Sequence, residues 1–122
     1  MKLKRLEYKL SVRRLPAGSP VVPEGEFYVL AKTDEEVSLV CETEYVPVWT
    51  EAREDGWRAF HIQGVLDFSM IGILSELSGI LAKARIGIFA VSTYNTDYIL
   101  VKEEKFEQAL DILEDSGYMI VS

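Results

Sequence analysis

The order of apolar patterns in the C-terminal half restricts the fold more than any other feature of this sequence. Short runs of branched and aromatic residues, typical of strands, alternate with two stretches whose apolar residues recur at helical spacing. The expected strands are 57–63, 86–93, 97–102 and 118–121, and the expected helices are 70–84 and 103–116. This β-α-β-β-α-β order predicts an α+β, ferredoxin-like fold. The continuously apolar run 86–93 predicts a strand buried on both faces.

The pattern of apolar and polar residues in the N-terminal half predicts strands and no helix. Residues 8–13 alternate apolar and polar side chains, as a half-buried strand does. Residues 27–33 and 37–41 read as the two strands of a hairpin. The intervening run PAGSPVVPEGE contains three prolines and two glycines, so it predicts an irregular loop.

A shift of 60 positions aligns the two predicted hairpins. VLAKTDEEVSLVCE then falls on FAVSTYNTDYILVK, and each segment has a threonine just before its turn. Shared hairpin chemistry accounts for so weak a match, and two related half-domains are the other interpretation. A sheet without helices cannot cover its own apolar face, so the two halves should share one unit. We therefore expect a reduced, helix-poor repeat over 1–56 and a complete domain over 57–122, with 43–56 as the linker.

Composition limits the chemistry that this chain can carry. Of its 122 residues one is histidine and one is cysteine, which excludes a disulfide framework and thiolate-rich or histidine-rich metal sites. No stretch reaches the roughly 18 apolar residues of a membrane span, and the N-terminus lacks the apolar core of a signal peptide. We expect a cytoplasmic protein with no metal, no cofactor and no membrane contact.

Charge is unevenly distributed along the chain. The net charge is -7, which is unfavourable for general nucleic-acid binding. The first 15 residues nevertheless carry six basic side chains against one acidic one, a balance that suits RNA or anionic lipid. Because the same residues alternate apolar with polar, the favoured interpretation is a strand whose basic face lies beside acidic neighbours.

The junction between the strand ending near 63 and the following helix is the first candidate site. Backbone amides are unpaired at a helix start and the helix dipole is positive there, so a ligand carboxylate is favoured. Asp67 or Ser69 can equally cap the helix, which is the simpler interpretation of either residue. Glycine inside a helix costs about 1 kcal/mol relative to alanine. Gly72, in the first turn of the predicted helix, therefore indicates close approach of a strand or ligand. Gly79 indicates the same close approach against the sheet.

The second predicted hairpin is the other candidate site. Its turn carries five small polar groups, namely Ser92, Thr93, Asn95, Thr96 and Asp97. Ordinary turn chemistry accounts for such residues, but Asp97 begins the return strand, where its carboxylate could meet a ligand ammonium group. His61 and Cys41 stand alone in predicted strands and are interpreted as packed side chains.

Over residues 57–121 the chain resembles the ACT domain family. The resemblance rests on an ordered set of motifs: GVLDFS before the first helix, GIL within it, ARIGIFAVST entering the hairpin and TDYILV leaving it. More narrowly, the chain is similar to small tandem ACT-like proteins related to the CASTOR arginine sensors and to the regulatory region of aspartate kinases. The run SLVCE resembles the first, reduced repeat of such proteins.

The resemblance implies a binding module for an amino acid or similar small zwitterion. The loop that receives the ligand would contain Asp67, Phe68, Ser69, Met70, Ile71 and Gly72. Main-chain groups of the edge strand would come from Ile86, Gly87 and Ile88, and side-chain polarity from Ser92, Thr93 and Asp97. The ligand carboxylate would meet the helix-start amides and its ammonium group the strand carbonyls and Asp97. Exposed edge strands favour a homodimer, and a separate protein could be the regulated partner.

Other functions stay open at this point. A ligand-free interaction or structural module fits the same fold. An enzyme using His61, or the pair Asp67 and Asp97, is disfavoured because no nucleophile–base constellation appears in the sequence. No catalytic residue is therefore predicted, and nucleic-acid binding through the basic first strand is equally disfavoured.

Overall fold

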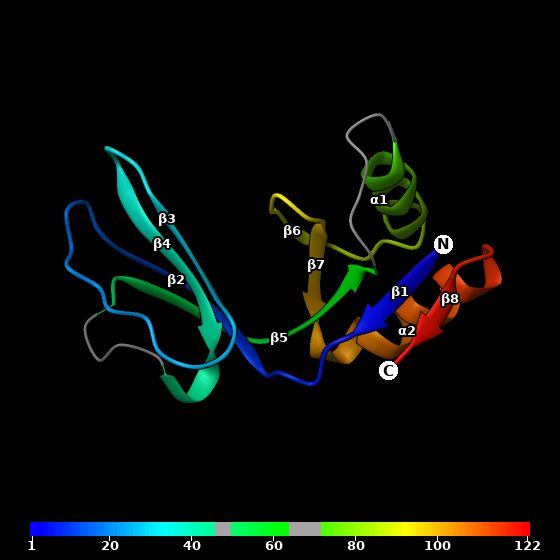
Figure 1. The fold of residues 1–122 in the computed structure, drawn as a ribbon, viewed down its shortest axis with the longest axis horizontal. Coiled ribbons are helices and arrows are strands. Elements are labelled where there is room, and N and C mark those ends of the chain that lie inside the picture. Colours follow the sequence, from blue (N-terminus) through cyan, green and yellow to red (C-terminus); the bar gives the residue numbers. More distant parts are fainter. Residues whose placement is uncertain (46–49, 64–71) are drawn as a thin grey trace. The chain divides into compact units, whose positions relative to one another are not determined.

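The predicted β-α-β-β-α-β order is confirmed in the computed structural model, which describes residues 1–45, 50–63 and 72–122 (Figure 1). The elements are β5 (Ala52–Ile62), α1 (Ile73–Lys83), β6 (Phe89–Ser92), β7 (Asp97–Lys102), α2 (Glu103–Asp115) and β8 (Met119–Val121). The chain forms two units, which we call the helical unit (Met1–Glu7 with Arg58–Ser122) and the β unit (Tyr8–Trp57).

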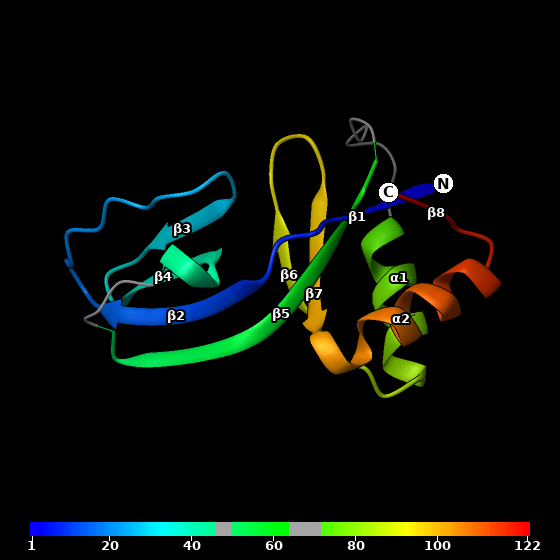
Figure 2. The same cartoon turned by 90° about the horizontal axis from the view of Figure 1, so that it is seen from below.

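Both helices of the helical unit cover the same face of its strands (Figure 2). Leu77 and Leu81 of α1 are fully buried there, because they lie four residues apart on one helix face. The four buried residues of α2 follow the same spacing: Phe106, Ala109, Leu110 and Leu113. They pack against alternate strand positions, Phe60 and Ile62 on β5 and Ile99 and Val101 on β7.

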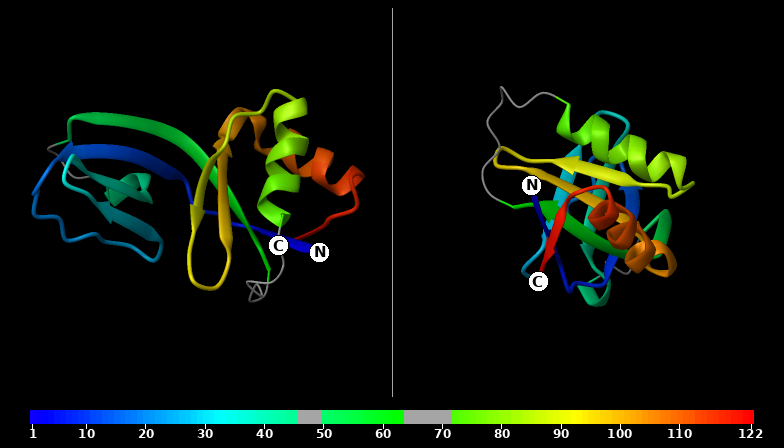
Figure 3. Two further views of the ribbon diagram at one scale, coloured as in Figure 1. Left: turned by 90° about the horizontal axis from the view of Figure 1, so that it is seen from above. Right: turned by 90° about the vertical axis from the view of Figure 1, so that its right-hand side faces the viewer.

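The N-terminal strand β1 (Lys2–Arg5) belongs to the helical unit and not to the half in which it is encoded. It pairs antiparallel with β5 and parallel with β8, so the strand order in this unit is β6-β7-β5-β1-β8 (Figure 3). Leu3 is fully buried in the core beneath the helices, which explains why the strand is held there. The structure thus departs from the expected division at 56/57, since residues 1–7 pack with the C-terminal part.

Arg5, a basic side chain of β1, lies beside acidic ones, as interpreted from the sequence for the basic face of this segment. Arg5 forms ion pairs with Glu107 on α2 and with Glu7, and its guanidinium lies over the ring of Phe106. The hydrogen bond from Arg5 raises the arginine's own pKa and lowers that of the Glu107 carboxyl. The arginine therefore ties β1 to the start of α2.

The β unit has the ferredoxin-like strand order with its helices replaced by loops. It contains β2 (Leu10–Pro16), β3 (Tyr28–Lys32), β4 (Glu36–Glu42), the short 3-10 helix η1 (Thr43–Tyr45) and the first part of β5, in the order β3-β4-β2-β5. A loop stands where the first helix would be, and η1 stands in place of the second. The predicted linker 43–56 is wrong in part, because residues 52–56 continue β5 and pair with β2.

The two hairpins share one register at an offset of 60 residues. Lys32 faces Val37 and Val29 faces Val40 in the first, while Ser92 faces Asp97 and Phe89 faces Leu100 in the second. Their turns are closed alike. Thr33 N–H donates to the Glu36 carbonyl at 2.9 Å, and Thr93 N–H donates to the Thr96 carbonyl at 2.8 Å. The threonine noted in the sequence is therefore the residue that closes each turn.

Candidate functional site

Five of the expected site residues, Asp67, Phe68, Ser69, Met70 and Ile71, lie outside the described residues. The sixth, Gly72, is the N-cap of α1 and has a φ of 92°. This left-handed conformation explains the glycine, and a Cβ built on it would meet nothing within 4 Å. No described strand approaches Gly72, so that part of the expectation is wrong, and close approach of a ligand stays a prediction. Gly79, which is exposed with open space around it, likewise does not pack against the sheet.

No side chain caps the start of α1 in the described part of the chain. The first-turn amides of a helix have no intrahelical acceptors, and the helix dipole makes them a favourable place for an anion. The Gly72 carbonyl accepts the Glu76 N–H at 2.8 Å, which fixes the first turn. The helix start is thus a regular one with donors available.

The polar residues of the β6–β7 turn bond to one another. Ser92 Oγ donates to Asp97 Oδ1 at 2.6 Å, across a pair of facing strand residues. Thr93 Oγ1 donates to the Thr96 carbonyl at 3.0 Å and accepts the Thr96 N–H at 3.3 Å. Ser92 and Thr93 are exposed and Asp97 is half-buried, so the carboxylate stays within reach of a ligand.

Thr96 connects this turn to the end of β5. Its hydroxyl is buried and donates to the Ile62 carbonyl at 2.7 Å. Ile62 is the last residue of β5, directly before the segment that contains Asp67 and Ser69. The structure therefore brings the polar turn beside the strand end that leads to the expected ligand loop. The sequence did not indicate this contact.

Residues Ile86–Ile88 precede β6 and are not part of it, because α1 ends in a Schellman motif. Arg85 adopts a left-handed φ of 61°, and the Ile86 N–H donates to the Leu81 carbonyl at 3.0 Å. The Ile86 side chain is buried in the core, whereas Gly87 is exposed with open space beside it. The predicted strand 86–93, buried on both faces, is thus wrong. β6 covers only Phe89–Ser92, and its residues alternate between half-buried and exposed.

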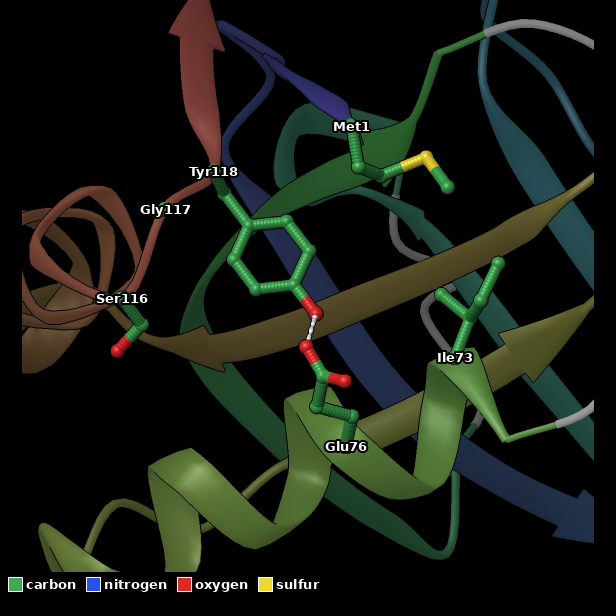
Figure 4. Close-up of a pocket in the computed structure, with 6 residues that line it drawn as sticks. All are labelled: Met1, Ile73, Glu76, Ser116, Gly117 and Tyr118. Atoms are coloured by element: carbon green, nitrogen blue, oxygen red, sulfur yellow. Dashed lines mark hydrogen bonds between the residues drawn. The ribbon is translucent and has the colours of Figure 1, made fainter.

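A cavity of about 260 Å³ lies beside the first turn of α1 (Figure 4). Its described lining residues are Met1, Ile73, Glu76, Ser116, Gly117 and Tyr118. The Tyr118 ring is buried, and its hydroxyl donates to Glu76 Oε1. Burial and then the Glu76 carboxylate raise the pKa of Tyr118 to about 12, so the phenol stays a donor at neutral pH. No feature of the sequence pointed to either residue, since nothing local marks a glutamate of α1 and a tyrosine of the α2–β8 connection as neighbours.

Within the described ranges there is no group of three or more His, Cys, Asp or Glu side chains that could hold a metal ion. His61 lies half-buried with its ring 5.0 Å from that of Tyr98. Cys41 is buried, and this burial raises the pKa of its thiol. No described helix is long and apolar enough to cross a membrane.

The fold and these sites define a small α+β module of the ferredoxin-like class. The family profile of the ACT domain matches residues 52–115, just over half of the chain. This chain belongs to the ACT domain family.

A crystal structure of a protein from Agrobacterium tumefaciens is 32% identical, with a TM-score of 0.89 over 98% of this chain and 91% of that one. The regulatory enzyme aspartate kinase of Clostridium acetobutylicum shares the fold, at a TM-score of 0.65 and 14% identity over 93% of this chain and 33% of that one. The mouse cytosolic arginine sensor for mTORC1 subunit 1 is 28% identical over 89% of this chain and 35% of its own length. The chain thus spans about a third of the curated relatives it matches.

Proposed function

We propose that this protein is a regulatory module that binds an amino acid and acts without chemistry of its own. The observation that carries the proposal is the Thr96–Ile62 hydrogen bond, which holds the polar turn beside the strand end leading to the ligand loop. Membership of the ACT family and similarity to a protein described as a cytosolic arginine sensor support it. We infer that this chain also works in the cytosol.

A zwitterion would be held from both ends at this place. Its carboxylate would meet the amides at the start of α1, which no described side chain caps and where the helix dipole favours an anion. Its ammonium group would meet Asp97, whose carboxylate is oriented by Ser92. Charge-assisted hydrogen bonds of this kind are about twice as strong as neutral ones, so both ends would contribute to affinity. Loop residues 67–72 would complete the site.

The first test is a thermal-shift screen against the common amino acids, followed by calorimetry on each hit. A ligand that binds only the folded protein stabilises it by about 2.7 kcal/mol at 100 times its dissociation constant. We expect a selective rise in melting temperature that Asp97→Asn abolishes, although the asparagine keeps an acceptor for Ser92. Asp111→Asn, an equal change on the exposed face of α2, should respond as the wild type does.

The rival function is a ligand-free interaction module. The mutual hydrogen bonds of Ser92, Thr93, Thr96 and Asp97 favour it, because they satisfy the turn without a ligand. This rival would be established if no amino acid shifted the melting temperature of either the wild type or Asp97→Asn.

The regulatory output would be self-association through the edge of β6. Among the described strands β6 pairs with β7 alone, and its residues FAVS include no charge that would block pairing. Hydrogen-bonded and non-bonded pairs alternate along an antiparallel hairpin. Since Thr93 bonds to Thr96, the Ala90 N–H points away from β7 toward the open edge. A second copy could pair there, and a ligand bound near this edge would shift the assembly equilibrium.

Ala90→Pro should convert the associated protein to a monomer, because proline removes the outward N–H without breaking a β6–β7 bond. Ala90→Ser keeps that donor and should associate as the wild type does. Sedimentation equilibrium over a range of concentrations distinguishes them. Equal association of the two variants would exclude this edge as the interface, and a wild type that stays monomeric would exclude self-association.

A further inference from the structure

The Glu76–Tyr118 cavity has the features of a site separate from the β6–β7 turn. Its walls come from the first turn of α1, from Met1 and from the α2–β8 connection, and they include neither Ser92 nor Asp97. Figure 4 shows the Tyr118 hydroxyl aimed at the Glu76 carboxylate, with the Met1 and Ile73 side chains extending beside the pair. The cavity therefore combines one carboxylate with an apolar wall.

Tyr118 makes this carboxylate a fixed group instead of a freely rotating surface one. The tyrosine side chain is buried, with 7% of its surface exposed, and its hydroxyl reaches Glu76 Oε1. Loss of this hydrogen bond would destabilise the folded protein, since an unsatisfied buried hydroxyl costs about 1–3 kcal/mol. One carboxylate oxygen is thus oriented by the protein, and no described basic side chain forms an ion pair with Glu76.

The lining also selects the shape of a ligand. Ile73 and the Met1 thioether can contact methylene groups, while Glu76 is the one charged side chain among the described lining residues. The volume of about 260 Å³ accommodates a short aliphatic chain. A net charge of -7 raises the local concentration of cations around the protein. We propose that this cavity binds the ammonium group of a small aliphatic amine, with the Glu76 carboxylate as its counter-charge.

The test is titration calorimetry of the full chain at pH 7.5 with three probes: n-butylammonium chloride, n-butanol and ammonium chloride. Butylammonium carries both charge and chain, whereas each of the others carries one of the two. We expect saturable binding of butylammonium, at least about tenfold tighter than either other probe. Butanol lacks the charged hydrogen bond, which contributes about 1.5–3 kcal/mol, and ammonium lacks the aliphatic chain. Equal affinity for butylammonium and ammonium, or no saturable binding, would overturn the proposal.

Variants separate this site from general attraction to an acidic protein. Glu76→Gln keeps an acceptor for Tyr118 and should abolish binding, while Tyr118→Phe should weaken it by releasing the carboxylate. Asp111→Asn removes an equal charge from α2 and should bind as the wild type does. Binding retained in Glu76→Gln, or lost equally in Asp111→Asn, would contradict the assignment. The proposal does not depend on amino-acid binding at the turn, since Asp97→Asn should leave butylammonium binding unchanged.

Discussion

Replacing Arg13 by methionine is expected to raise the free energy of unfolding by about 1–3 kcal/mol. Arg13 lies on β2 with 2% of its surface exposed, and its Nε and Nη2 atoms have no hydrogen-bond partner among the described residues. Its Nη1 reaches Thr50 Oγ1 only at 3.4 Å. Loss of solvation lowers the pKa of Arg13, which shows that its environment disfavours the charge. Methionine has a similar length and no charge to bury.

The oxygen acceptors near Arg13, on Asp55 and Thr50, have other partners. The nearby carboxylate of Asp55 forms an ion pair with Arg53 at 2.8 Å and accepts from Ser11 Oγ at 2.5 Å, and these bonds hold its pKa below the usual range. Thr50 Oγ1 has a second partner in the Arg14 carbonyl at 3.3 Å. Removing the guanidinium therefore leaves Asp55 and Thr50 with other partners. The remaining group beside it is the buried Cys41 thiol, which is only a weak acceptor.

Arg14→Met is the matched control for this prediction. Arg14 is the next residue, is exposed, and pairs with Glu51 at 3.2 Å on the surface. Surface pairs of this kind contribute about 0–1 kcal/mol, so this variant should change stability little. Urea unfolding of both variants measures the difference. Destabilisation by Arg13→Met beyond that of Arg14→Met would show that the β unit uses the buried charge for its own stability.

The fold of the helical unit was predictable because its signals are local. The apolar spacing that defines α1 and α2 is contained within 11 and 13 successive residues, and each strand run is short and bounded by turn residues. The placement of β1 was not predictable, because its partners β5 and β8 are distant in sequence and only register selects them. In the sequence, Leu3 does not differ from other apolar strand residues. Only the structure shows that it lies in the core beneath α1 and α2.

The end of α1 shows why the edge strand was predicted too long. Residues 86–93 are nearly all apolar, and apolarity alone cannot separate a strand from a buried helix cap. The Schellman motif at α1 uses Arg85 at the left-handed position, whereas the same motif at α2 uses Gly117 with a φ of 108°. A glycine at residue 85 would have marked the helix end in the sequence, and an arginine there gives no such signal.

The candidate site was predictable at the level of segments but not of contacts. The turn 92–97 was selected by its polar composition. The hydrogen bond that holds this turn beside the end of β5, from Thr96 to Ile62, joins residues 34 positions apart. Glu76 and Tyr118 are 42 residues apart and carried no motif. Local patterns therefore selected candidate segments, and only the tertiary structure showed which polar groups face each other.

The Tyr118–Glu76 pair should make stability fall at alkaline pH. The pKa of Tyr118 is raised from 10.0 to about 12 in the folded protein, so the folded state holds the phenolic proton more tightly than the unfolded state does. The stabilisation is complete below pH 10, falls between pH 10 and 12, and is lost above that range. The loss amounts to about 2–3 kcal/mol, since each unit of pKa corresponds to about 1.36 kcal/mol.

Tyr118→Phe isolates this effect because it removes the titrating group and keeps the ring. Lysine and other tyrosine side chains also titrate above pH 9, but their contributions cancel when the two proteins are compared. The difference in unfolding free energy between wild type and Tyr118→Phe should be constant up to about pH 9 and then shift by about 2–3 kcal/mol in favour of the phenylalanine variant by pH 12. A difference that stays constant through this range would mean that Tyr118 is neither desolvated nor bonded to Glu76, and the amine site would lose its oriented carboxylate with it.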